Sequence, residues 1–237
     1  MSTGRAGEAE LLDVVARGAG LAPADRASLL ARAAGGEHVD ALPLGDRDRL
    51  IIGLRSALLG RTVLAQDVCP HCGETMEFPL DTASLLALSS ADPGEVRQDG
   101  FAVRVRTPTG ADLVAAARAD DPRGALLAAT VVDATCDGRP VAAGELPRSV
   151  QDAVAERIAV ADPLAEISLD LTCAECGGGW QSVFDPVEFV WSELREWSRG
   201  LLRTVHVLAR AYGWTEPEVL AIPEDRRRAY VELALDG

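Results

Sequence analysis

Apolar residues recur at helical spacing through the last third of the chain. After Asp185-Pro186 they step by three or four residues, which places them on one face of a helix of about seven turns. Gly213 follows the last of them and is expected to end the helix. The pattern predicts one long amphipathic helix with an apolar stripe made of Val190, Leu194, Trp197, Leu201, Val205, Leu208 and Tyr212. Thr215–Glu218 forms a capping box for a short helix beyond it, and 223–235 is predicted to form the last one.

Shorter periodic segments precede this helix. They predict two short helices within 9–34. They also predict one helix each within 42–60, from Thr109 onward, and within 149–166. Asp46 is the expected N-cap of the 42–60 helix. Residues 101–108 alternate like a half-buried strand, and 125–141 are predicted to form a helix that runs into a hairpin at Asp137-Gly138.

One short pattern is written twice. VCPHCGETMEFPLD spans 68–81 and TCAECGGGWQSVFD spans 172–185. Each copy has a β-leaning run, a Cys-x-x-Cys-Gly motif and a second β-leaning run that ends in Asp. Glycine after the second cysteine allows the positive φ that a tight turn needs. Each copy is therefore predicted to be a knuckle between two strands that directs two thiolates to one point.

A structural zinc requires four ligands in a tetrahedron, and one knuckle offers only two. We expect the two knuckles to form one four-cysteine site that binds a single structural Zn2+, with the ligands Cys69, Cys72, Cys173 and Cys176. His71, inside the first knuckle, is an alternative ligand. A dithiol oxidoreductase remains a second alternative function, although a thioredoxin-like CxxC begins a helix and strand-like residues flank both motifs here.

These elements predict an α+β fold that is mostly helical. It consists of a split four-cysteine zinc ribbon with an inserted α/β segment and a C-terminal helical region. The expected divisions are an N-terminal helical region, the first ribbon half, the inserted segment, the second ribbon half and the C-terminal helical region, at 1–60, 61–82, 83–165, 166–186 and 187–237.

The net charge and the absence of known motifs argue against several classes of protein. A formal net charge of −14 argues against a protein that binds nucleic-acid phosphates, so a zinc-ribbon nucleic-acid-binding regulator is the first alternative rather than the leading interpretation. No apolar run is long enough to span a membrane. The N-terminus has acidic residues where a secretory signal needs an apolar core, which predicts a cytoplasmic protein. No nucleotide-binding, metalloprotease or hydrolase motif occurs, so we expect no enzyme.

The order of several segments resembles the T4-type phage baseplate proteins of contractile-tailed phages and related contractile injection systems. The segments are LPLGDRDRLIIGLR, CPHCGETMEF, RVRTPTGADL, CAECGGGWQSVFDPVEFVWSEL and RTVHVLARAYGWTEPEVLAIPEDRRRAYVEL, and the resemblance covers about residues 10–235. It implies a non-enzymatic structural component or assembly factor of a phage-tail-like baseplate. The implied partners are other baseplate, hub or tape-measure subunits.

The C-terminal helices are the expected partner surface. Tryptophan and arginine are enriched at such surfaces, and the candidate residues are Trp191, Trp197, Arg226, Arg227 and Arg228. Two alternatives stay open: the tryptophans can belong to the core, and the arginines can form a solvated helix face.

Overall fold

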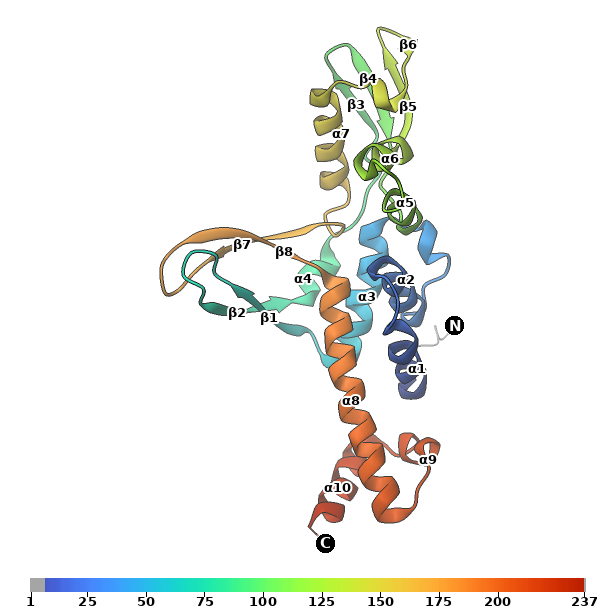
Figure 1. Ribbon diagram of the computed structural model, residues 1–237, viewed down its shortest axis with the longest axis vertical. Coiled ribbons are helices and arrows are strands. Elements are labelled where there is room, and N and C mark those ends of the chain that lie inside the picture. Colours follow the sequence, from blue (N-terminus) through green and yellow to red (C-terminus); the bar gives the residue numbers. More distant parts are fainter. Residues whose placement is uncertain (1–6, 237) are drawn as a thin grey trace.

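The computed structural model describes residues 7–236 and is elongated (Figure 1). A helical frame lies in the middle, an inserted segment at one end of the long axis and the C-terminal helices at the other, while two β-hairpins project to one side. The fold is α+β, with a four-stranded sheet and two two-stranded sheets among the described residues. Residues 1–6, which belong to the N-terminal stretch that argues against a secretory signal, lie outside the described range. No described helix is long and apolar enough to cross a membrane.

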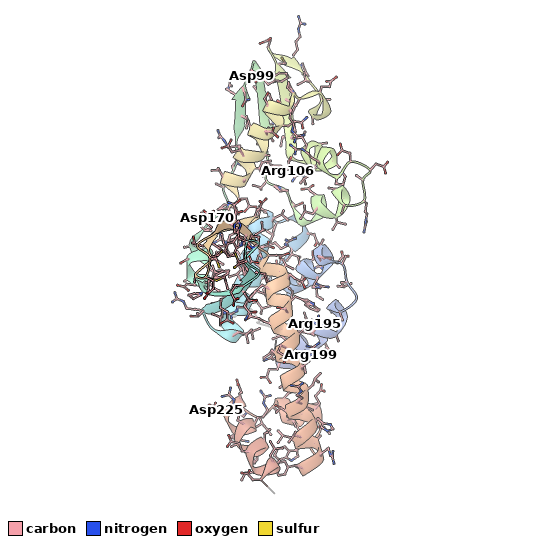
Figure 2. All side chains as sticks on the ribbon, turned by 60° about the vertical axis from the view of Figure 1, so that its left-hand side comes forward. Asp99, Arg106, Asp170, Arg195, Arg199 and Asp225 are labelled. Atoms are coloured by element: carbon pink, nitrogen blue, oxygen red, sulfur yellow. The ribbon has the colours of Figure 1, made fainter. Side chains whose placement is uncertain are left out.

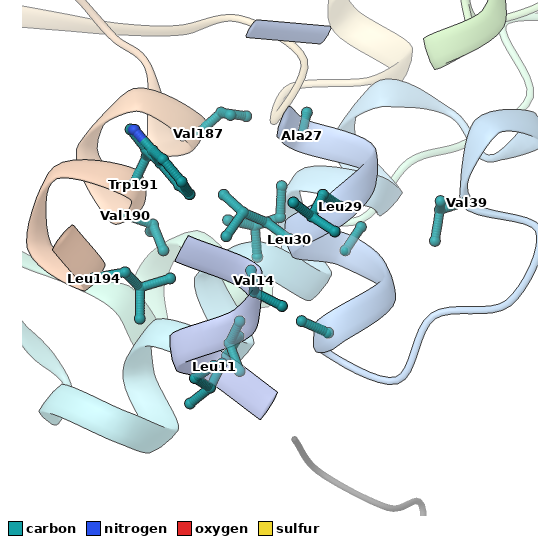
Figure 3. Close-up of a cluster of buried hydrophobic side chains, with 14 residues drawn as sticks. Leu11, Val14, Ala27, Leu29, Leu30, Val39, Val187, Val190, Trp191 and Leu194 are labelled. Carbon is teal, nitrogen blue, oxygen red and sulfur yellow. The ribbon is translucent and has the colours of Figure 1, made fainter. Parts of the chain in front are cut away.

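The frame consists of four helices around one apolar core (Figure 3). α1 (Glu8–Gly18), α2 (Pro23–Ala33) and α3 (Leu44–Leu59) pack against the first half of α8 (Pro186–Tyr212), and the 3-10 turn η1 (Val39–Ala41) connects α2 to α3. The apolar faces of the helices converge on fully buried side chains, among them Leu11, Leu30, Ile51, Trp191 and Leu194. Each such burial contributes on the order of 1.5–3 kcal/mol, so the core fixes the position of α8.

The long helix predicted from the apolar stripe is α8. The Asp185 carboxylate accepts hydrogen bonds from the backbone N–H groups of Val187 and Glu188 at 2.9 and 3.1 Å, which caps the helix start. Gly213 follows the last turn with φ of 71°, a left-handed conformation that favours glycine. The second half of α8 extends beyond the frame (Figure 1). This helix therefore connects the frame to the C-terminal region.

The inserted segment has its own sheet and core. Its antiparallel strands follow the order β3 (Glu95–Gln98), β4 (Phe101–Val105), β5 (Val131–Cys136) and β6 (Arg139–Pro140). α7 (Arg148–Ala161) packs on β3 and β4, and Val103, Val150 and Val154 are buried between them. Asp137 and Gly138 both have positive φ, which confirms the predicted hairpin turn.

Shorter helices complete the segment. α5 (Gly110–Ala116) begins with a capping box in which Thr109 and Asp112 bond each other's backbone N–H. It is followed by α6 (Pro122–Thr130), and the 3-10 turn η2 (Ala143–Glu145) precedes α7. The expected helix start at Thr109 is therefore confirmed.

One carboxylate connects the inserted segment to the frame. Asp162, at the end of α7, accepts a hydrogen bond from the backbone N–H of Gly45 at 3.0 Å and one from the Ser90 hydroxyl at 2.7 Å. It thereby caps the start of α3, which begins at Leu44. The prediction that Asp46 caps this helix is wrong, because Asp46 already lies within its first turn. α4 (Thr82–Ala87) packs on α3 nearby.

The C-terminal region adds two helices to the free half of α8. α9 (Glu216–Leu220) begins at the predicted capping box, where Glu218 accepts hydrogen bonds from the N–H and hydroxyl of Thr215, both at 2.8 Å. α10 (Glu224–Leu235) packs across α8. The Arg227 side chain on α10 donates a hydrogen bond of 2.6 Å to Glu8 on α1. The C-terminal region is thus bonded to the N-terminal helix as well as to α8.

Candidate metal centre

Two β-hairpins carry the repeated motifs. β1 (Thr62–Val68) pairs with β2 (Thr75–Asp81), and β7 (Ile167–Thr172) pairs with β8 (Gly179–Phe184), both antiparallel. The strands alternate between more and less exposed side chains, as half-buried strands do. Both hairpins leave the frame on the same side and their tips lie together (Figure 1). Each tip is one Cys-x-x-Cys-Gly turn.

The two turns have the same backbone geometry. In the first, Cys69 N–H donates to the Glu74 carbonyl and Gly73 N–H donates to the Cys69 carbonyl, both at 2.9 Å. The second repeats both bonds around Cys173 and Gly177. The two glycines have φ of 78° and 70°, which is the positive φ expected after the second cysteine. Each turn directs its two sulfur atoms toward the other hairpin.

The four sulfur atoms form one cluster. All lie within 4.8 Å of one another. Across the hairpins, the Sγ atoms of Cys69 and Cys176 are 3.7 Å apart, as are those of Cys72 and Cys173. All four are free thiols. A tetrahedron with metal–sulfur bonds of about 2.3 Å has edges of about 3.8 Å, so the cluster can hold a metal ion with little movement.

Two polar contacts join the hairpins beside the cluster. The Trp180 indole N–H donates to the Asp67 carboxylate at 3.1 Å, and His71 Nε2 lies 3.2 Å from the Gly179 carbonyl oxygen. Hydrogen bonds from Ser182 and Trp180 hold the pKa of Asp67 below its usual range. The ring of His71 is thus in contact with the opposite hairpin, and the four-residue cluster does not include it.

The thiols differ in acidity. Desolvation opposes ionisation of Cys69, but hydrogen bonds from the backbone N–H groups of His71 and Cys72 outweigh it and lower the pKa of Cys69 to about 7. The N–H of Glu74 favours the Cys72 thiolate, yet desolvation and the neighbouring thiols raise the pKa of Cys72 to about 12. The cluster therefore loses one proton easily and resists accumulating four negative charges, which a bound cation would balance.

A family model described as T4 bacteriophage base plate protein matches residues 27–191. The chain belongs to this family. The match covers more than two thirds of the sequence and confirms the resemblance to this family, over a shorter range than the expected 10–235. No match was found among the curated proteins or among the solved structures.

The matched residues of this baseplate family protein run from α2 to the first turns of α8. They include the inserted segment, both hairpins and all four clustered cysteines. The free half of α8, with α9 and α10, follows the matched range. The family match thus includes the candidate metal centre and, of the expected partner-surface residues, only Trp191.

The structure corrects two of the five expected partner-surface residues. Trp191 is 2% exposed and packs in the frame core, where the Arg26 guanidinium lies over its ring. Arg227 is 4% exposed and is ion-paired with Glu8. Both side chains are taken up within the chain and do not face a partner. Trp197 is half-buried, whereas Arg226 and Arg228 are exposed, so the three consecutive arginines do not form one basic patch.

Sequence reasoning missed two residues that position the site. Asp67 and Trp180 join the hairpins, and neither residue belongs to a recognisable sequence motif. Both lie close to a cysteine in the sequence: Asp67 is two residues before Cys69, and Trp180 is four residues after Cys176. Pairing them requires knowing that the two hairpins face each other.

Proposed function

We propose that this protein is a non-enzymatic structural component or assembly factor of the baseplate of a phage-tail-like contractile injection system. The observation that carries the proposal is the family match over residues 27–191. Other baseplate, hub or tape-measure subunits are the proposed partners, and assembly is proposed to take place in the cytoplasm. The elongated shape, with separate segments at its two ends and side (Figure 1), supports a role in joining several neighbours.

We further infer that one Zn2+ is held by Cys69, Cys72, Cys173 and Cys176. The all-sulfur donor set and the 3.7 Å sulfur–sulfur distances support zinc over a hard cation. Four thiolates leave no open coordination position, so the ion would serve structure rather than catalysis. Its role would be to hold the two hairpins together and, through them, the ends of the inserted segment.

Elemental analysis of protein purified without added metal tests the zinc site. The expected result is one zinc per chain, lost in Cys69→Ser. Cys136→Ser is the matched control, because Cys136 lies on β5 outside the cluster, and it should keep its zinc. A folded, metal-free protein whose clustered thiols reduce a disulfide substrate would refute the zinc site and support the dithiol oxidoreductase alternative.

Deleting the gene in a producing strain tests the assembly role. We expect sheathed particles with intact baseplates to be lost, and restored by the wild-type gene. Mass spectrometry of purified particles then separates the two forms of the proposal, since a structural component remains in the particle and an assembly factor does not. Intact, functional particles in the deletion strain would contradict the proposed function.

A further inference from the structure

The C-terminal helices enclose a groove that the chain does not fill. In Figure 2, α8 passes Arg195 and Arg199 beside the frame and continues below it, where α10 begins near Asp225. Between α8 and α10 lies a cavity of about 440 Å³, which is within the usual range for a binding pocket. We call it the α8–α10 groove.

The floor of the groove is apolar and open. Trp197 and Leu201 of α8 and Val231 of α10 line it. Gly200 lies between them, and a Cβ atom at this position would have no other atom within 4 Å. Leu235, one turn beyond Val231 on the same face of α10, is 71% exposed. The groove therefore has room for a large apolar side chain, and the apolar surface continues past its end.

The charged side chains on the rim of the groove sum to a net negative charge, because two of its carboxylates are paired with arginines and a third is not. Arg227 is paired with Glu8, and Arg228 with Glu224. Glu232 also lines the groove, and it has no ion-pair partner among residues 7–236. The paired charges balance one another, which leaves the Glu232 carboxylate as the net charge beside an apolar floor.

We propose that the α8–α10 groove binds a basic amphipathic helix of another subunit. An apolar side chain of that helix would lie over Gly200, and a Lys or Arg would lie beside Glu232, which is the usual arrangement of a helix in an apolar groove. The net charge of −14 opposes a second copy of this chain and favours a basic partner. The proposed function supplies only the origin of the helix, a baseplate neighbour.

Gly200 offers a clean test because its side-chain position is empty. The probe is a fluorescently labelled amphipathic helical peptide of leucine and lysine, titrated with the full-length protein in an anisotropy assay. Gly200→Leu fills the groove and should weaken binding at least tenfold. Gly200→Ala is the matched control: it makes a similar gain in helix propensity but adds only one methyl group, and binding should stay within threefold of wild type. Circular dichroism confirms that both variants are folded.

Each outcome has a defined meaning. Binding that is equal in wild type and Gly200→Leu reflects general attraction to an acidic protein and overturns the proposal, as does failure of the leucine–lysine peptide to bind. Equal binding of a leucine–glutamate peptide overturns the charge argument. A dimer in sedimentation that Gly200→Leu dissociates would assign the groove to a second copy instead.

Complementation of the deletion strain separates this inference from the proposed function. If both are right, Gly200→Ala restores particles and Gly200→Leu does not. Restoration by both variants would refute the groove and leave the baseplate role intact. Particles that assemble without any copy of the gene would refute the baseplate role, whatever the peptide assay shows.

Discussion

Replacing Asp162 with alanine tests whether the start of α3 depends on a carboxylate from the far end of the inserted segment. Asp162 is 1% exposed and accepts hydrogen bonds from Gly45 N–H at 3.0 Å and from the Ser90 hydroxyl at 2.7 Å. Alanine removes both acceptors. The first-turn N–H of α3 would then be buried without a partner, and the inserted segment would lose one of its bonds to the frame.

The magnitude follows from these two bonds. A hydrogen bond to a charged group contributes about 1.5–3 kcal/mol, and loss of an N-cap costs about 0.5–2 kcal/mol. The Ser90 hydroxyl can rotate toward another acceptor, so its bond counts for less than the cap. Asp162 also repels the nearby Asp48 carboxylate, and removing that repulsion offsets part of the loss. We expect Asp162→Ala to lower the free energy of unfolding by about 2–4 kcal/mol.

Urea unfolding followed by far-UV circular dichroism measures this loss. Asp46→Ala is the matched control: this carboxylate lies in the first turn of the same helix, with its side chain 40% exposed, and should cost less than about 1 kcal/mol. Gly45→Ala attacks the same contact from the other side, because its Cβ would lie 1.9 Å from Asp162 Oδ1. The double variant Gly45→Ala/Asp162→Ala should then lose little more than either single one. A change below about 0.5 kcal/mol in Asp162→Ala, or a larger loss in Asp46→Ala, would refute the assigned cap.

Three further outcomes are expected. Removing metal with a chelator should speed amide hydrogen exchange across β1–β2 and β7–β8 while α3 stays protected, as measured by mass spectrometry. Burial raises the pKa of Asp48 to about 6 despite its pairing with Arg47. The folded state therefore binds this proton more tightly than the unfolded state. The free energy of unfolding should fall by roughly 3 kcal/mol as the pH rises from about 4 to 7. Urea titrations of Asp48→Asn should lack this fall. Arg227→Ala breaks a mostly buried ion pair with Glu8 and should cost about 1–3 kcal/mol in the same assay, whereas the exposed neighbour Arg226→Ala should cost under about 0.5 kcal/mol.

Elements with strong local signals could be predicted from the sequence. Asp185-Pro186 and Gly213 mark the two ends of α8 because capping and left-handed φ depend on adjacent residues only. The turn at Asp137-Gly138 and the two Cys-x-x-Cys-Gly turns follow for the same reason. The clustering of the four cysteines was predictable as well, because each motif supplies only two of the four ligands that a structural zinc site needs.

Features that depend on distant contacts could not be predicted. The cap of α3 comes from Asp162, which lies 117 residues from Gly45, so Asp46 was the best local candidate and the wrong one. Trp191 and Trp197 belong to the same helix, yet Trp191 is buried within the frame core, whereas Trp197 packs against its edge and stays half-buried. Arg227 is buried and paired with Glu8 of α1, whereas its two arginine neighbours are exposed. In each case the deciding partner lies more than a hundred residues away along the chain.

The inserted segment contacts the frame at several places besides Asp162: the Leu44 N–H donates to the Pro108 carbonyl at 3.1 Å, and the Arg49 side chain donates to the Leu86 carbonyl at 2.7 Å. Isolated two-stranded hairpins are marginal in water, so a metal ion bound at the Cys cluster would be expected to stabilise both of them. Taken alone, a cross-link between Cys72 and Cys173 would close a loop of about 100 residues and contribute about 4.7 kcal/mol of chain entropy. The hydrogen bonds of Asp162 exist only in the folded chain, so they do not shorten this loop in the unfolded ensemble to which the entropy applies. A persistent cross-link and the contacts with the frame would therefore stabilise the fold by different means: the cross-link lowers the entropy of the unfolded chain, and the contacts lower the free energy of the folded one.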